Sequence, residues 1–271
     1  MEIINFQLSI KIKMKEIYKR FKKFYKKKGI YHIFSLVIPN IMNSFKFSYD
    51  KCHYFYWFFY SRLFNKPLIH VIGDSHVRTF RRFRLFVLHH LGSPTAYNLK
   101  NDKSTTNSKK KLFVIINKFN RKKDIALLVF GEVDCRVHIY YQYKKNDEKI
   151  KITELINRTI SNYGWVLEQL KKMDVNFFVF CIPPTRQKQR AYCPKKLNAP
   201  AETRRKIFEV FNKKLKKFCI KNNYKYIDIY SKITDKNGFM SENYAADDVH
   251  LNGKIDKFLY EVLDKKFKIS L

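Results

Sequence analysis

Short apolar runs alternate with longer segments of helical periodicity over most of the chain. Runs at residues 68–72, 125–130, 175–182 and 224–229 predict buried strands, and residues 95–99 predict a shorter one. Apolar strands that alternate with helices form parallel sheets that are covered on both faces. The pattern therefore predicts an α/β domain with a mainly parallel sheet.

Helices are expected between these strands, at residues 77–90, 112–119, 152–173, 201–221 and 253–266. Gly92 stands where the first of them would end, as a C-terminal glycine often does. Residues 112–119 also fit a strand, but the turn-like stretch at 120–123 favours a helix. Polar residues predict loops at 100–110 and 185–200.

The N-terminal region carries a basic amphipathic segment at residues 10–28, where apolar side chains follow a helical period and lysines fill the other face. Such a helix can lie on an anionic membrane surface. It can equally pack on a folded domain with its lysine face in water. Both interpretations stay open at this point.

Residues 30–42 are mostly apolar but too few to span a bilayer, and no small-residue cleavage site follows them. Residues 53–60 are almost wholly aromatic. The composition changes at Lys66-Pro67, so we expect an N-terminal extension over residues 1–65 and a main domain over residues 66–271.

Lysine and arginine exceed the acidic residues so far that the formal net charge is +33. A charge of this size favours anionic partners such as membrane surfaces, nucleic acids or acidic glycans. Biased codon composition would also produce it, because lysine, asparagine, isoleucine, tyrosine and phenylalanine are abundant together. We do not expect nucleic-acid binding, since the charge is diffuse and no recognition motif or repeat is present.

The cysteines are odd in number and widely spaced, and they form no CxxC pair; they are Cys52, Cys135, Cys181, Cys193 and Cys219. This usage indicates a reducing compartment, so we expect a cytoplasmic protein that can be peripheral to a membrane. The sequence contains no Walker loop, GxGxxG or HExxH pattern. We therefore expect no cofactor and no metal.

The first strand ends in Gly73-Asp74-Ser75-His76. The glycine permits a sharp turn, and the following helix start offers free N–H groups to a bound anion. A serine placed there could act as a nucleophile beside a developing oxyanion. The alternative is that Asp74 or Ser75 only caps the helix.

A second candidate lies just before the last predicted helix, where Asp247 precedes His250 by three residues. A serine hydrolase needs a base for the hydroxyl proton and a carboxylate that holds the base. His250 could take the proton from Ser75, with Asp247 as its partner. The alternative is that His250 packs or caps at the helix start.

Together, the blocks Gly73–His76, Gly92, Gly131–Asp134 and Asp247–His250 resemble the SGNH (GDSL-type) hydrolase family, and they occur in its order. The resemblance covers about residues 66–271. It implies a three-layer α/β/α sandwich of the flavodoxin-like kind. It also implies hydrolysis of esters, often acyl groups on lipids or carbohydrates.

The same resemblance implies roles for individual residues. Ser75 would be the nucleophile, His250 the base and Asp247 the partner of the base. The backbone N–H groups of Ser75 and Gly92 would form the oxyanion hole. In the third block the family has asparagine where this chain has Val133, a variant that resembles a distinct SGNH-like branch.

Because Val133 has no side-chain donor, one arm of the expected oxyanion hole is absent, and Arg136 is our candidate for a replacement donor. An ordinary ion pair with Glu132 at the strand end is the alternative. The candidate substrate-binding residues are Asp74, His76, Glu132, Arg136 and His138.

The sequence favours a serine esterase or deacetylase, with an O-acyl group on a carbohydrate as one candidate substrate. An acyltransferase, or a non-catalytic glycan-binding protein that uses the same cleft, is the alternative. A small-molecule or glycan ester is thus the expected partner.

Overall fold

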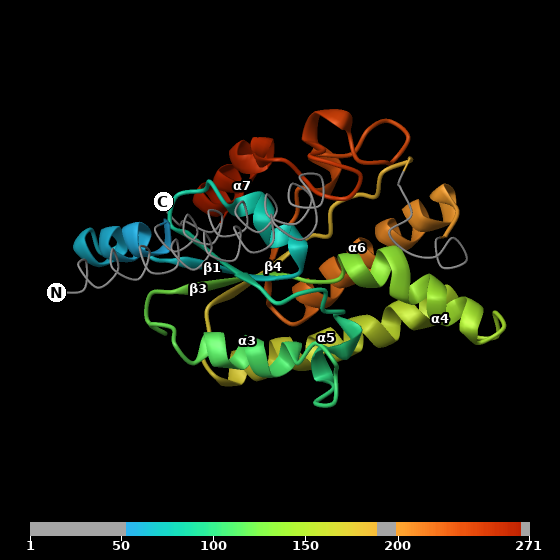
Figure 1. Ribbon diagram of the computed structural model, residues 1–271, viewed down its shortest axis with the longest axis horizontal. Helices are drawn as coiled ribbons and strands as arrows, with labels where there is room; N and C mark the ends of the chain where they lie inside the picture. The colour runs from blue at the N-terminus through green and yellow to red at the C-terminus, as the bar shows by residue number, and fades with distance from the viewer. Residues whose placement is uncertain (1–52, 189–198, 267–271) are drawn as a thin grey trace, which may run out of the picture. The chain divides into compact units, whose positions relative to one another are not determined.

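The computed structural model describes residues 53–188 and 199–266 (Figure 1). The chain forms two compact units, Met1–His53 and Tyr54–Leu271. The segments at 10–28 and 30–42 lie outside the described residues. The aromatic residues before Lys66 belong to the second unit, so this unit begins earlier than the composition change at residue 66.

A five-stranded parallel sheet forms the centre of the second unit, in the order β2-β1-β3-β4-β5. Four of the strands match runs that the sequence predicts. The chain leaves β1 toward β2 on one side and later places β3 on the other, so a topological switch point lies between β1 and β3. The strands are β1 (Ile69–Gly73), β2 (Phe86–His90), β3 (Ile125–Val129), β4 (Phe177–Phe180) and β5 (Lys225–Ile227).

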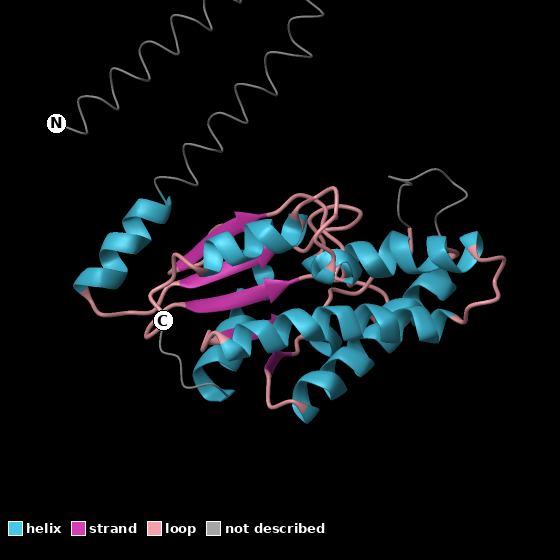
Figure 2. Cartoon of the chain, turned by 90° about the horizontal axis from the view of Figure 1, so that it is seen from below, coloured by secondary structure: helices cyan, strands magenta, loops and turns pink. Residues whose placement is uncertain are grey.

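Helices cover both faces of the sheet, as the α/β expectation requires (Figures 1 and 2). Figure 1 shows α3 and α5 on one side of the sheet and α7 on the other. Helix α4, which lies between Gly131 and α5, was not predicted from the sequence pattern. The helices are α3 (Ser108–Ile116), α4 (Ile139–Lys145), α5 (Ile152–Lys172), α6 (Ala201–Lys221) and α7 (Asp256–Glu261).

The helix expected at residues 77–90 is wrong. A short 3-10 helix, Ser75–Phe80, is followed by a turn and then by β2. Leu85 adopts a left-handed backbone with φ of 63° just before the strand. Phe80, Phe83 and Phe86 are spaced by three residues and imitate a helical period, but they pack together from a helix, a turn and a strand.

The strand expected at residues 95–99 is also wrong, because a 3-10 helix, Tyr97–Lys100, occupies this stretch. The backbone N–H groups of Ala96 and Tyr97 donate to the Asp134 carboxylate and not to a neighbouring strand. The helix expected at 253–266 is confirmed as helical, with α7 between shorter helical turns on each side.

Residues 53–63 form a helix at the start of the second unit. Its Trp57 packs in a small cluster with Leu68, Leu85 and Val87, beside the much larger main core around the sheet. Among the described helices, none has the length and apolar character needed to cross a bilayer.

Candidate active site

The sheet register brings two loops together at the carboxyl edge of the strands. Gly73 at the end of β1 pairs with His90 of β2 and with Val129 of β3. Ser75 and Gly92 each lie two residues beyond this row. The turn with the serine and the loop with the glycine therefore start side by side, next to the β1/β3 switch point where α/β folds bind ligands.

Gly73 is required by the close approach of β1 and β3. A Cβ atom at this position would lie 1.9 Å from the Val129 carbonyl oxygen. Directly after it, Asp74 caps the 3-10 helix by accepting from the His76 backbone N–H at 2.9 Å. The capping interpretation therefore holds for Asp74, while Ser75 is the first residue of the helix.

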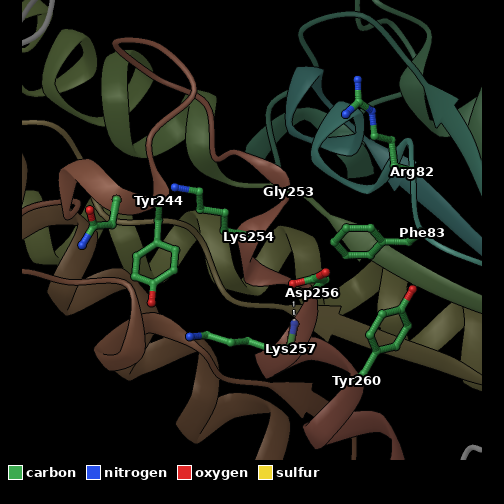
Figure 3. A pocket seen from close by; sticks show the side chains of 9 residues that line it. Arg82, Phe83, Tyr244, Gly253, Lys254, Asp256, Lys257 and Tyr260 are labelled. Carbon is green, nitrogen blue, oxygen red and sulfur yellow. Dashed lines mark hydrogen bonds between the residues drawn. The ribbon is translucent and has the colours of Figure 1, made fainter.

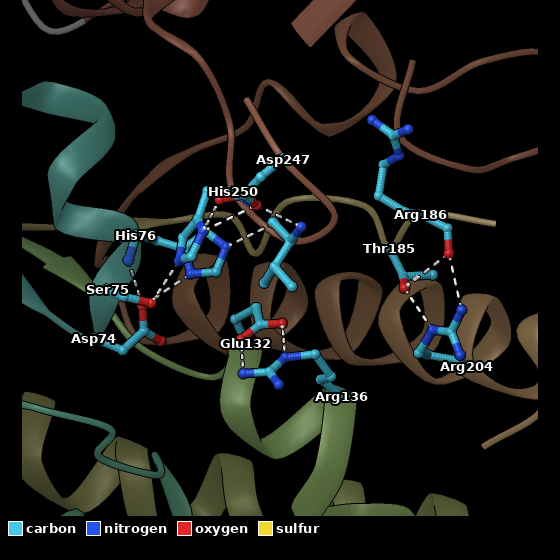
Figure 4. Close-up of polar contacts among 11 residues, drawn as sticks. Asp74, Ser75, His76, Glu132, Arg136, Thr185, Arg186, Arg204, Asp247 and His250 are labelled. Atoms are coloured by element: carbon cyan, nitrogen blue, oxygen red, sulfur yellow. Dashed lines mark hydrogen bonds and ion pairs between the residues drawn. The ribbon is translucent and has the colours of Figure 1, made fainter. Parts of the chain in front are cut away.

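Ser75, His250 and Asp247 form a continuous hydrogen-bonded chain (Figure 4). The Ser75 hydroxyl lies 2.7 Å from His250 Nε2, although 175 residues separate them. His250 Nδ1 lies 2.8 Å from Asp247 Oδ2. With the proton on Nδ1, the ring donates to the carboxylate and accepts from the hydroxyl. This is the contact pattern of a nucleophile, a base and its partner.

Asp247 remains charged next to the ring. Burial acts to raise the pKa of its carboxyl, but donation from the backbone N–H groups of Val249 and His250 and from the imidazole lowers it below the usual range. Both backbone bonds measure 2.8 Å. They also fix the loop conformation, which a bridge between Ala245 and Leu251 closes at its base.

His76 connects this loop to the serine turn. Its Nδ1 lies 3.0 Å from Asp74 Oδ1 and its Nε2 lies 3.1 Å from the Val249 carbonyl oxygen. Burial lowers the pKa of His76, but the charge and hydrogen bond of Asp74, the charge of Glu132 and the Val249 carbonyl raise it to about 9. The ring is thus an imidazolium that donates from both nitrogens.

Thr79 makes a second connection from the same 3-10 helix. Its hydroxyl donates to the Leu251 carbonyl oxygen at 3.2 Å. The two carbonyls that flank His250, on Val249 and Leu251, are therefore both held by the helix that begins with Ser75. No pattern in the sequence identifies Thr79 for this task, because a threonine among arginines and phenylalanines carries no distinctive signal.

Asp134 is fully buried and holds the loop that follows β2. Its Oδ2 accepts from the Ala96 N–H at 2.6 Å and its Oδ1 from the Tyr97 N–H at 3.1 Å. Burial raises the pKa of this carboxyl to about 7, against the opposing effect of the two N–H donors. Gly92, with φ of 98°, starts the loop that is held in this way.

The candidate binding residues Glu132 and Arg136 contact each other directly. The guanidinium donates from Nε to Glu132 Oε1 at 2.6 Å and from a terminal nitrogen to Oε2 at 3.2 Å. This is the ion pair that the sequence left as an alternative. Val133, between them in the chain, is half-buried and offers no side-chain donor.

His138 lies one helical turn beyond Asp134. Its ring packs against Tyr97 with centroids 4.8 Å apart, and its Nδ1 is 3.9 Å from Asp134 Oδ1. Burial lowers the pKa of His138. The residue therefore lies against the loop that Asp134 holds, and its hydrogen bonds and ring contacts within the described residues do not involve Ser75 or His250.

Asp74, His76 and Glu132 present ligand atoms within 4.8 Å of one another, which is close enough for a metal ion. Asp74 Oδ1 pairs with the His76 imidazolium and Glu132 pairs with Arg136, whereas the buried Asp74 Oδ2 has no hydrogen-bond partner among the described residues. These two pairs balance the local charge.

Beyond β4, Arg204 organises another loop near the site (Figure 4). This buried guanidinium donates to the Thr185 hydroxyl at 2.7 Å and to the carbonyl oxygens of Arg186 and Ala199 at 2.9 Å. Sequence reasoning missed Arg204, since an arginine on a charged helix resembles its solvent-exposed neighbours.

Comparisons with known proteins agree with this fold. A model of the family described as GDSL-like lipase/acylhydrolase matches residues 69–263. A GDSL-like lipase from Bacteroides thetaiotaomicron VPI-5482 has a TM-score of 0.51 at 13% sequence identity, covering 76% of this chain and 89% of that chain. A candidate acylhydrolase from Bacteroides fragilis NCTC 9343 has a TM-score of 0.50 at 15% identity, covering 75% and 89%. No curated protein matches the chain in sequence.

Proposed function

Since the chain belongs to the GDSL-like lipase/acylhydrolase family, a class of ester-hydrolysing enzymes, we propose that Ser75 is its nucleophile, His250 its general base and Asp247 the carboxylate that orients the base. The observation that carries this proposal is the hydrogen bond of 2.7 Å between the Ser75 hydroxyl and His250 Nε2. The Asp247 carboxylate, 2.8 Å from His250 Nδ1, supports it.

In the proposed reaction, Ser75 Oγ attacks the ester carbonyl carbon while His250 Nε2 takes the hydroxyl proton. Asp247 stabilises the imidazolium that results. Collapse of the tetrahedral intermediate breaks the bond to the alcohol, which leaves with the proton from His250. Water then attacks the acyl-serine, again with His250 as base, and releases the carboxylic acid and the free hydroxyl.

Charge develops on the former carbonyl oxygen, and the backbone N–H groups of Ser75 and Gly92 are the donors proposed for it. The Asp134 carboxylate supports the second donor, because it holds the loop after Gly92. Val133 supplies no third donor. Losing one such donor typically costs about 3 kcal/mol of transition-state stabilisation, so the reaction is slow unless Arg136 takes this place.

For the substrate, we propose a short O-acyl ester on a carbohydrate. Supporting this choice, the Asp247 side chain is 49% exposed and the His250 side chain 26% exposed, so one edge of the site is open to water. An open edge suits a large hydrophilic molecule. The basic composition, with a net charge of +33, suits one that also carries acidic groups.

An acyltransferase is the second candidate, and the open edge at Asp247 and His250 is the observation that favours it. An alcohol acceptor bound at this edge could compete with water for the acyl-serine. A non-catalytic glycan-binding protein would use the same cleft without forming that intermediate.

Residues 10–28, outside the described part of the chain, are proposed to contact anionic membrane surfaces, and the protein is proposed to be cytoplasmic. Removing these residues should then reduce binding to anionic vesicles.

A panel of acetyl and longer acyl esters tests the proposed function, with wild type and Ser75→Ala assayed side by side. Hydrolysis by wild type that is lost in Ser75→Ala supports the esterase. Transfer of the acyl group to an added alcohol, also lost in Ser75→Ala, supports the acyltransferase. Equal rates in both proteins would place the chemistry elsewhere.

A further inference from the structure

The helix at residues 53–63 turns an apolar face to solvent. Seven large hydrophobic residues are exposed in the described part of the chain, and five of them lie between residues 55 and 64. Their side chains are 54–78% exposed; they are Phe55, Tyr56, Phe59, Leu63 and Phe64. A cluster of this kind on a folded protein marks a contact surface, whereas single exposed residues do not.

Helical spacing explains why the cluster forms one face. Phe55, Phe59 and Leu63 follow each other at intervals of four residues, so they line one side of the helix. Trp57 projects from the other side and packs with Leu68 and Leu85 in the domain. The Trp57 side thus anchors the helix to the domain. We name the exposed side the aromatic face; it consists of Phe55, Tyr56, Phe59, Leu63 and Phe64.

Cationic side chains border the aromatic face. Arg62 lies 5.1 Å above the Phe58 ring, whose centroid is 5.8 Å from that of Phe59 on the face. Arg84 donates to the Tyr60 hydroxyl at 3.4 Å, and the centroid of the Tyr60 ring lies 4.5 Å from that of Phe64 on the face. No acidic residue occurs from residue 54 to residue 66. Aromatic rings beside arginines are the combination that suits the headgroup region of an anionic bilayer.

The geometry points to a peripheral lipid-docking site: we propose that the aromatic face inserts into the headgroup region of an anionic membrane. This face consists of other residues than the segment at 10–28. The described part of the helix, residues 53–63, is shorter than a membrane-spanning helix and has the length of a segment that lies in the interface.

Docking in this way sets the direction of the active site. The chain runs from the helix into the amino end of β1, and Ser75 follows the carboxyl end of the same strand. Five residues of strand span about 17 Å. Figure 2 shows the strands pointing away from this helix. The docked enzyme therefore presents Ser75 away from the bilayer, toward a substrate in water and not toward lipids of the same membrane.

Vesicle co-sedimentation of the full-length protein tests the proposal. The vesicles contain roughly one part phosphatidylglycerol to two parts phosphatidylcholine, with phosphatidylcholine alone for comparison. The test variant is Phe59→Ser/Leu63→Ser. The matched control is Val114→Ser/Ile220→Ser, which changes exposed hydrophobic residues on α3 and α6. Neither variant alters the charge or residues 10–28.

We expect the test variant to bind anionic vesicles at least about tenfold more weakly than wild type, and the control to bind within about twofold of it. Raising NaCl from about 0.1 M to about 0.5 M should weaken wild-type binding. Hydrolysis of a soluble ester should be equal in all three proteins, so the result is independent of the proposed function.

Unchanged vesicle binding in the test variant would overturn the proposal, because residues outside the aromatic face would then hold the lipid. An equal loss in both variants would overturn it too, since exposed apolar residues anywhere would have the same effect. Light scattering tests whether the face instead joins two copies of the chain. A wild-type dimer that dissociates in the test variant, with vesicle binding unchanged, would make the face an interface between two copies.

Discussion

His76 Nε2 lies 3.1 Å from the carbonyl oxygen of Val249, a residue 173 positions further along the chain. The same ring pairs with Asp74 through Nδ1 and lies 4.8 Å, between ring centroids, from His250. Through this one imidazolium, the turn that carries the proposed nucleophile is tied to the loop that carries the proposed base. Such supporting contacts decide whether the geometry of the proposed catalytic residues persists.

Replacing His76 by asparagine should lower activity without touching the reacting groups. The shorter amide cannot bridge Asp74 and Val249 at once, so the His250 loop loses an anchor. A displacement of about 1 Å at such a site costs on the order of a hundredfold in rate, and we expect kcat to fall by this amount with KM little changed. Steady-state kinetics on a soluble ester measures it.

Arg78 provides the control for His76, because it is exposed on the same 3-10 helix. The Arg78→Ala variant should keep wild-type kcat. If His76→Asn also keeps wild-type kcat, the positioning role is wrong and the Thr79 contact alone holds the loop.

Stability should fall with rising pH because of His76. Its pKa rises from 6.5 to about 9 in the folded protein. A group with a raised pKa contributes stability that is fully present below pH 6.5 and is lost as the pH rises through 9. The shift corresponds to about 3 kcal/mol in the free energy of unfolding. Urea denaturation at about pH 7.5 and about pH 8.5 measures part of this change, in an interval below the ordinary pKa of 9.0 of the buried thiols of Cys135, Cys181 and Cys219, which burial raises further.

Asp134 contributes little to the pH dependence of stability above about pH 7.5. Its pKa is raised from 3.8 to about 7, so its effect on stability is lost as the pH rises through 7. The His76→Asn variant should therefore show a much flatter dependence above pH 7 than wild type. Equal slopes for the two proteins would mean that His76 is neutral in the fold.

Asp134→Asn should weaken both the fold and catalysis. An amide has one acceptor oxygen, so one of the N–H groups of Ala96 and Tyr97 loses its partner. A buried donor left without a partner costs about 1–3 kcal/mol in unfolding free energy. The loop after Gly92 also loses its support, and kcat should fall with it. Asp102→Asn, at a surface ion pair with Lys109, should change stability by less than about 0.5 kcal/mol. Equal stability of the two variants would contradict the role assigned to Asp134.

Arg136 should influence kcat if it replaces the missing asparagine donor. Removing it alone would leave the Glu132 carboxylate buried without its partner and would destabilise the protein by about 3–5 kcal/mol. The informative variant is therefore Glu132→Gln/Arg136→Gln, compared with Glu132→Gln. We expect the double variant to have a kcat about a hundredfold lower and a similar KM. A raised KM at unchanged kcat would instead assign Arg136 to substrate binding.

The long, strongly periodic elements could be predicted from the sequence. Residues 201–221 match α6 at both ends, and residues 152–173 match α5 to within one residue. Near the site, hydrophobic periodicity predicted the wrong secondary structure, because tertiary contacts override local pattern there. Residues 77–90 form a short helix and a strand, because Phe86 and Val87 are buried in the sheet and not on a helix face.

The same division applies to the site. Ser75, Asp247 and His250 could be proposed from the sequence because a serine hydrolase needs those residue types within recognisable blocks, and the structure places the three side chains in hydrogen-bond contact. The contacts of Thr79 and of His76 with the loop could not be identified. They depend on side chains meeting carbonyl oxygens about 170 residues away, and any residue has a carbonyl oxygen.

Covalent labelling tests the central claim most directly. A small phosphonate ester that mimics the tetrahedral intermediate should react with a serine that is activated by a base. Peptide mass spectrometry should find the phosphonyl group on Ser75 in wild type, and the labelling rate should fall by roughly three orders of magnitude in His250→Ala. A modified serine other than Ser75, or labelling of Ser75 at the same rate in His250→Ala, would contradict the proposed nucleophile and base.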